Sequence, residues 1–303
     1  MRHRQVTGPP ARNRAELLRA LGALTERPAT GHARLAELTG LPRPTGADWT
    51  EAFVLQLVPN AAIYAGAEGM LGGGAAELVA GFWRALRLPV PAEPDHVAAL
   101  LGLYASLVDA EYGEPAGPRR TLLGQARAAL LHEHLLSWLP AYAHAMADAG
   151  PPPYAAWARL LREALLAEAA DAGVADRLPV HLRAVPPVTG DGLDGVLTAL
   201  LAPARSGIVV TRAHLAAAAR QHGLGLRQGN RRAILRSLIE QDPDAVLAAL
   251  AGQARTWQAR HRADRAAFGP AAGHWADRAS ATAGLLTETV HHCRVTPVVT
   301  AKE

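Results

Sequence analysis

Hydrophobic residues recur along most of the chain at the 3.6-residue period of an α-helix, and no period-two alternation of useful length occurs before residue 183. The run Ile208–Val210 is too short to build a sheet. We therefore predict an all-α protein. The main segments expected to form helices before residue 183 are 14–24, 33–38, 49–58, 77–88, 94–107, 121–142 and 151–173.

The first of two central helices reads EPDHVAALLGLYASL, from residue 93 to residue 107. Pro94 suits the first helical position, where a missing N–H costs nothing, and Asp95 would then lie in the first turn at the positive end of the helix dipole. His96, Leu100 and Tyr104 are expected on one face of this helix.

The second central helix reads TLLGQARAALLHEHLLSWLPAY, from residue 121 to residue 142. Leu135 and Trp138 fall on its hydrophobic face, and His134 lies one turn before Trp138. Pro140 is expected to kink or end the helix.

The polar residues of this helix pair allow two interpretations. An acid with a histidine on one helix and a histidine with a tryptophan on the other would suit a groove that holds a cation beside apolar side chains. Alternatively, Asp95 is only a first-turn acid, His96 is solvated and Trp138 is a core anchor. The spacing alone leaves both open.

A linker is predicted at residues 183–195, RAVPPVTGDGLDG, which is rich in proline, glycine and aspartate. It divides a helical bundle at 14–176 from a smaller arginine-rich helical extension at 190–268. Because the apolar pattern fades after Phe268, residues 269–303 are expected to be a poorly ordered tail.

Composition narrows the function classes. Half of the residues are hydrophobic, which allows a substantial core, and the single cysteine excludes an internal disulfide framework and fits a reducing cytoplasm. The basic start has no apolar segment behind it, so it is not a signal peptide, and no stretch is long and apolar enough to span a membrane. The cluster His291-His292-Cys293 cannot easily close around one metal ion, so we expect no metal site and no cofactor.

Charge is distributed unevenly along the chain. Residues 51–176 contain fourteen acidic residues and seven arginines, a net charge of −7, although the whole chain has a formal net charge of +4. The middle of the chain is therefore expected to attract cationic ligands.

Two other function classes, catalysis and DNA binding, leave different traces in the sequence. Catalysis is unsupported, because no nucleophile elbow, no His-Glu-x-x-His metal pair and no thiol near a patterned histidine occur; we therefore expect no enzyme. The alternative function is DNA binding through a helix-turn-helix at residues 211–239. Its phosphate or base contacts would come from Arg227, Arg231, Arg232 and Arg236.

Several ordered motifs between residues 51 and 261 resemble the TorD-like family, cytoplasmic chaperones that mature molybdenum-cofactor oxidoreductases. They are EPDHVAALLGLY, EHLLSWLPAY, VPNAAIYAGAEGMLGG and GFWRAL, with RSGIVVTRAHL and GLGLRQGNRR similar to a C-terminal extension of one branch. The family's usual version has more charged residues after the glycines, where this chain has Gly74-Ala75-Ala76.

The resemblance implies an all-α bundle and a cytoplasmic chaperone that binds the twin-arginine leader peptide, or another segment, of an apo-molybdoenzyme catalytic subunit and assists cofactor insertion. It also implies either a monomer or a helix-exchanged dimer. The absence of a long apolar stretch predicts no direct membrane insertion, and because a solvated charged face is the usual explanation of the C-terminal arginines, we expect no nucleic-acid partner. The peptide-binding residues that follow from the resemblance and the shared helix face are Asp95, His96, Leu100, Tyr104, His134, Leu135 and Trp138.

Overall fold

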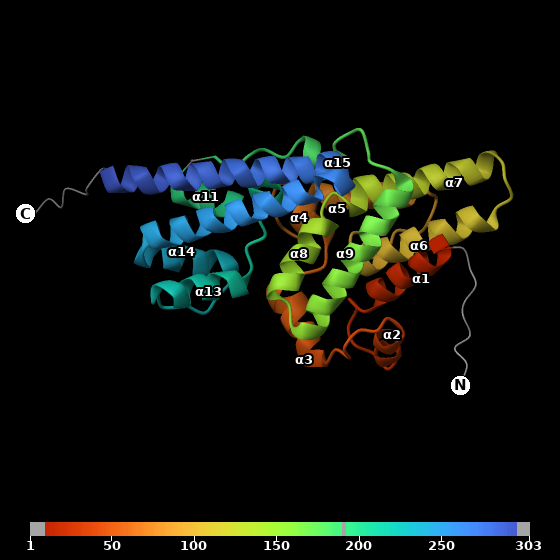
Figure 1. The fold of residues 1–303 in the computed structure, drawn as a ribbon, viewed down its shortest axis with the longest axis horizontal. Helices are drawn as coiled ribbons and strands as arrows, with labels where there is room; N and C mark the ends of the chain where they lie inside the picture. Colours follow the sequence, from red (N-terminus) through yellow and green to blue (C-terminus); the bar gives the residue numbers. More distant parts are fainter. Residues whose placement is uncertain (1–9, 190–191, 296–303) are drawn as a thin grey trace, which may run out of the picture.

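The computed structural model describes residues 10–189 and 192–295, and the predicted all-α class is confirmed (Figure 1). Within these residues the only β pairing is an isolated antiparallel bridge between Asn60 and His96. No helix in this part of the chain is long and apolar enough to cross a membrane.

The N-terminal body ends with α9 and contains eleven helical segments within the described residues. Two of them, η1 and η2, are π-helical. The segments are α1 (Pro10–Ala23), α2 (His32–Leu38), α3 (Gly46–Trp49), η1 (Thr50–Gln56), α4 (Ala61–Ala65), α5 (Gly73–Ala85), α6 (Val97–Gly113), α7 (Pro118–Ala129), η2 (Leu130–Leu135), α8 (Leu139–Ala149) and α9 (Pro152–Ala172).

The predicted second central helix is interrupted. A π-helical segment follows α7 without a gap, and a turn at 136–138 separates it from α8. Pro140 lies in the first turn of α8, where a proline needs no hydrogen-bond partner for its nitrogen. The break therefore comes before Pro140, and Trp138 lies in the turn between two helices.

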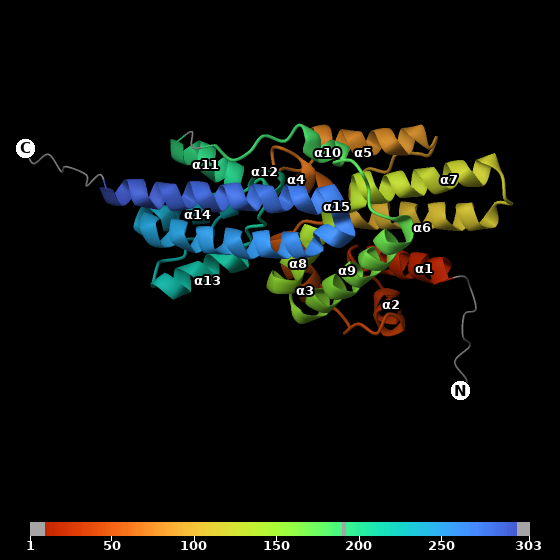
Figure 2. The same cartoon turned by 45° about the horizontal axis from the view of Figure 1, so that its top comes forward.

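The C-terminal part consists of short helices and one long helical hairpin. The short helices are α10 (Val180–Arg183), α11 (Gly192–Leu200), α12 (Pro203–Ser206), α13 (Arg212–His222) and α14 (Arg231–Gln241). In α15 (Pro243–Val295), Gly269 has φ 58° and ψ −134°, and Pro270 follows it. The chain turns back there, so the two arms of α15 lie side by side in both views (Figure 2).

The expected poorly ordered tail is wrong for residues 269–295, which belong to α15; residues 296–303 lie outside the described residues. The second arm packs mainly through small side chains, because Ala271, Ala272, Ala276 and Ala279 are buried together with Trp275. In a chain this rich in alanine, such positions give a weak hydrophobic signal, which explains the error.

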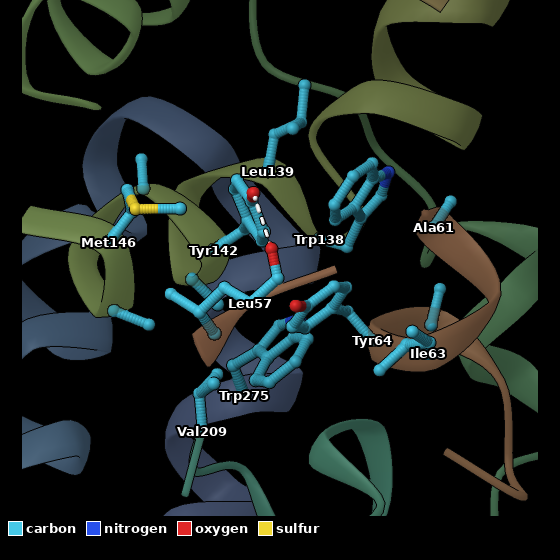
Figure 3. Packing of buried hydrophobic residues seen from close by; sticks show 14 of the residues in the cluster. Leu57, Ala61, Ile63, Tyr64, Trp138, Leu139, Tyr142, Met146, Val209 and Trp275 are labelled. Atoms are coloured by element: carbon cyan, nitrogen blue, oxygen red, sulfur yellow. Dashed lines mark hydrogen bonds between the residues drawn. The ribbon is translucent and has the colours of Figure 1, made fainter. Parts of the chain in front are cut away.

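The body and the C-terminal part share one hydrophobic core (Figure 3). Trp275 of α15 donates from Nε1 to the Ser137 carbonyl at 2.9 Å, in the turn before α8. Asp264 of α15 pairs with Arg162 of α9 and accepts from His144 Nε2 of α8 at 2.9 Å. The arginine-rich extension is therefore fixed against the body on the side of α8 and α9.

Candidate functional site

Asp95 lies before α6, not inside its first turn as predicted, because the helix begins at Val97. Its carboxylate is 4% exposed and accepts from Asn60 Nδ2 at 3.2 Å and from the Ala62 N–H at 2.9 Å. Ala62 lies in the first turn of α4, where N–H groups lack partners inside the helix. Asp95 therefore fastens the start of α4 to the start of α6.

His96 is the N-cap of α6, and its Nδ1 accepts from the Ala98 N–H at 3.1 Å. This bond leaves the proton of the neutral ring on Nε2. Burial lowers the pKa of His96, while the nearby Glu93, Glu26 and Asp95 raise it by less. The side chain is half-buried because it borders a groove.

The groove has a volume of about 640 Å³ and lies between the end of α1, the connection before α6, and the tryptophans of α3 and α5. Its lining consists of Thr25, Glu26, Arg27, Trp49, Trp83, Pro91, Ala92, Glu93, His96, Ala98 and Ala99. Both indole rings are held by backbone carbonyls: Trp49 Nε1 donates to Thr25 at 2.9 Å and Trp83 Nε1 to Pro94 at 3.3 Å.

The groove combines aromatic walls with two acidic residues. Glu26 and Glu93 are exposed at its edge, whereas Trp49 and Trp83 are only partly exposed. Arg27 is the one guanidinium in the lining, and its charge lies over the Trp49 ring at 5.9 Å. A ligand with a cationic group beside an apolar side chain matches this surface.

The other end of the predicted site is closed. Leu100, Leu135 and Trp138 are each 0% exposed. Trp138 stacks on Tyr64 with 5.3 Å between ring centroids (Figure 3). Its Nε1 donates to the His134 carbonyl at 2.8 Å. In this conformation these three side chains are core residues, and none of them contacts solvent.

Tyr104 is also fully buried, but its hydroxyl joins an ionic network between helices. It donates to Glu168 Oε2 at 2.5 Å and accepts from Arg127 Nη1 at 3.1 Å. Arg14 of α1 donates to the other Glu168 oxygen at 2.5 Å. Burial, and then the charge of Glu168, raise the pKa of Tyr104, so the hydroxyl stays protonated and holds α6 to α9.

His134 faces the C-terminal part of the chain. Its Nδ1 lies 2.9 Å from His181 Nε2 of α10, and its ring lies 4.9 Å from the Phe82 ring. Burial lowers the pKa of His134 to about 3 and that of His181 to about 4. With both rings neutral, one nitrogen donates and the other accepts, so this pair attaches α10 to η2.

The structure therefore divides the predicted residues into two groups. Asp95 and His96 lie at the groove, one beneath it and one in its wall, whereas the other five are interior. Four residues of the lining, Trp49, Trp83, Glu26 and Glu93, were not among the predicted site residues. Their positions in the chain gave no signal, because the segments that carry them meet only in the fold, through the bonds of Trp49 to Thr25 and of Trp83 to Pro94.

The alternative DNA-binding arrangement is not supported by this geometry. Residues 223–230 separate α13 from α14, a longer connection than the 3–4-residue turn of a helix-turn-helix. Arg231 Nη1 donates to the Val210 carbonyl at 2.9 Å, and Arg232 and Arg236 both pair with Asp194. Three of the four arginines are thus already bound within the fold.

No group of three or more metal-ligating side chains occurs among the described residues. The side chains of the His291–Cys293 cluster lie outside the described part of the chain. The expectation about that cluster stays a prediction.

A family model described as the nitrate reductase delta subunit matches residues 18–144. This region contains the groove and both central motifs, and it ends before α9 and the C-terminal part. The comparison with curated proteins gave no match, and the comparison with solved structures gave none either.

Proposed function

We propose that this protein binds a leader peptide or another segment of a molybdopterin oxidoreductase, because residues 18–144 match the model of the nitrate reductase delta subunit family, which is similar to the TorD-like molybdoenzyme-maturation chaperones. In this proposal it works in the cytoplasm on the apo-enzyme, and assists cofactor insertion and assembly before export or membrane docking. It binds its client and has no catalytic role.

The observation that carries the proposal is the groove at the start of α6. A leader peptide has a cationic start and an apolar continuation. Glu26 and Glu93 offer carboxylates to the cationic part, and the faces of Trp49 and Trp83 offer apolar surface to the continuation. The net charge of −7 over residues 51–176 favours the same ligand over a distance.

In this proposal the residues at the start of the first central motif shape the groove, and the remaining predicted residues support it from the core. His96 contributes to the groove wall, and Asp95 acts from below by fixing α4 against α6. The remaining five residues then support the wall through the core and do not touch the peptide; they are Leu100, Tyr104, His134, Leu135 and Trp138. This refines the peptide-binding set that the resemblance implied.

Peptide binding tests the proposal directly. A fluorescent peptide with two arginines before an apolar stretch should bind the full chain, and replacing both arginines with glutamine should weaken binding by about 1–3 kcal/mol, the scale of charge-assisted contacts. Affinity should also fall as salt rises, because the acidic residues are exposed. Fluorescence anisotropy at two salt concentrations measures both effects.

Variants locate the binding surface. Trp83→Leu should weaken peptide binding, since it removes an aromatic wall, whereas Leu122→Ala should not, because Leu122 is an exposed apolar residue on α7 outside the groove lining. Equal binding by wild type and Trp83→Leu, or equal affinity for the arginine and glutamine peptides, would contradict this assignment.

A further inference from the structure

Two arginines of the C-terminal part have no carboxylate partner among the described residues. Arg205 of α12 donates from Nη2 to the Pro187 carbonyl at 3.3 Å, and Arg278 of α15 donates from Nη2 to the Val185 carbonyl at 2.5 Å. These carbonyls are two residues apart in the connection between α10 and α11. The two guanidinium groups are therefore held over the same short stretch of backbone.

The elements that carry these arginines are firmly joined. Thr282 Oγ1 of α15 donates to the Ser206 carbonyl at 2.8 Å, and His274 Nε2 lies 3.3 Å from the Ala204 carbonyl. Gly207 follows with φ 70°, and a Cβ there would collide with the backbone of α15. The α12 turn therefore lies directly on the second arm of α15, beside the connection between α10 and α11 (Figure 2).

The charge around the two arginines is poorly compensated. Burial, and then the positive charge of Arg205, lower the pKa of Arg278, and Asp277 next to it has the opposite effect. The Nε of Arg205 is buried and has no hydrogen-bond partner. A guanidinium has five N–H donors, and within the described residues each of these arginines donates one of them to a backbone carbonyl. An unsatisfied donor on a charged group is costly, so a bound anion would stabilise this arrangement.

We propose that Arg205 and Arg278 form a binding site for a phosphate group, either as the free ion or as the monoester of a small molecule. Two guanidinium groups match the two negative charges of a phosphate, and their N–H groups suit its several acceptor oxygens. A single carboxylate would neutralise only one of the two charges. The site lies outside residues 18–144 and does not depend on the proposed client binding.

Isothermal titration calorimetry of the full chain with inorganic phosphate tests the site, in chloride buffer at constant ionic strength. We expect saturable binding with one site per chain, weakened about tenfold or more in Arg205→Gln and in Arg278→Gln. Arg255→Gln is the matched control, because Arg255 lies on the same long helix, is exposed and donates to Thr287. It makes the same charge change and should bind phosphate like wild type.

Arg278→Lys separates loss of binding from loss of folding, since it keeps the charge while removing the fork of donors. It should fold and bind with an affinity between those of wild type and Arg278→Gln. No saturable phosphate binding by the wild type, or equal weakening in Arg255→Gln and Arg205→Gln, would overturn the proposal.

The affinities of a nucleoside monophosphate, its nucleoside and inorganic phosphate distinguish a phosphate monoester from the free phosphate ion as the ligand. Tighter binding of the monophosphate that is lost in Arg205→Gln indicates a phosphate ester, and tighter binding of the inorganic ion indicates free phosphate. Binding of the nucleoside alone that survives both arginine substitutions would count against the site.

Discussion

The two ends of the central motif pair have opposite surroundings. At Asp95 and His96 the chain opens into a groove with aromatic walls and acidic edges, whereas Leu135 and Trp138 are buried in the core, where Trp138 packs against Tyr64 and Tyr142. Both ends carry a histidine and an acidic or aromatic neighbour in the sequence. The difference is made by the fold: Tyr64 of α4 and Tyr142 of α8 pack on Trp138, and α15 reaches the same turn through the bond from Trp275 to the Ser137 carbonyl.

The largest expected effect is at the closed end. Trp138→Ala should lower the free energy of unfolding by about 3–5 kcal/mol, because it removes a fully buried ring that stacks on Tyr64. Urea denaturation followed by circular dichroism measures it. Trp83→Ala, at the partly exposed groove wall, should cost clearly less; equal losses would remove the distinction between the two ends.

Acid should also destabilise the closed end. His134 and His181 have pKa values lowered by burial to about 3 and about 4, against about 6.5 in the unfolded chain. Below pH 6.5 these two histidines bind protons in the unfolded chain, whereas in the folded protein they stay neutral. Their contribution to stability is complete above pH 6.5 and is lost as pH falls toward 4, by roughly 1.4 kcal/mol per pH unit for each histidine.

The double variant His134→Gln/His181→Gln checks this pH dependence, since neighbouring amides preserve a donor and an acceptor. Its unfolding free energy, measured by urea denaturation at pH 7 and pH 5, should fall less between these values than that of wild type. His96→Gln should change this difference in unfolding free energy between pH 7 and pH 5 by a smaller amount, because His96 is half-buried. If the double variant lost as much unfolding free energy between pH 7 and pH 5 as wild type, His134 and His181 would have to be protonated or exposed in the folded protein.

Asp95 is expected to be structural even though it lies beside the groove. Asp95→Ala leaves the Ala62 N–H and the Asn60 amide without their buried acceptor, which should cost about 1–3 kcal/mol of stability. Thermal and urea denaturation measure this loss. A stability equal to that of wild type would mean that the contact between α4 and α6 does not depend on the carboxylate.

The helical class could be predicted because the 3.6-residue period extends through both parts of the chain, including the segments that became α6 and α9. Individual contacts could not. In sequence, an acid in the first turn of its own helix looks the same as an acid that fastens another helix. Asp95 fastens α4, because Asn60 and Ala62 come close to it in the fold. The alanines of the second α15 arm are weakly hydrophobic one by one, so the sequence did not reveal that they are buried together with Trp275.

The candidate site was predictable only at one edge. His96 borders the groove, but the groove also needs Trp49 of α3 and Trp83 of α5, whose contact with this site the sequence does not reveal. Trp138 falls on a hydrophobic helix face in the sequence, and that pattern fits a core residue and a groove residue equally. Packing against Tyr64 of α4 and Tyr142 of α8 makes it a core residue.

A double-mutant cycle between the groove and the peptide tests the central claim most directly, that the open end receives the cationic segment. The affinities of the arginine and glutamine peptides are measured by anisotropy on wild type, Glu93→Gln and Glu77→Gln; Glu77 is an exposed acid on α5 outside the groove lining. We expect the penalty for losing the peptide arginines to shrink by about 0.5–1.5 kcal/mol on Glu93→Gln and to stay unchanged on Glu77→Gln. The same penalty on all three proteins would contradict the assignment of the groove.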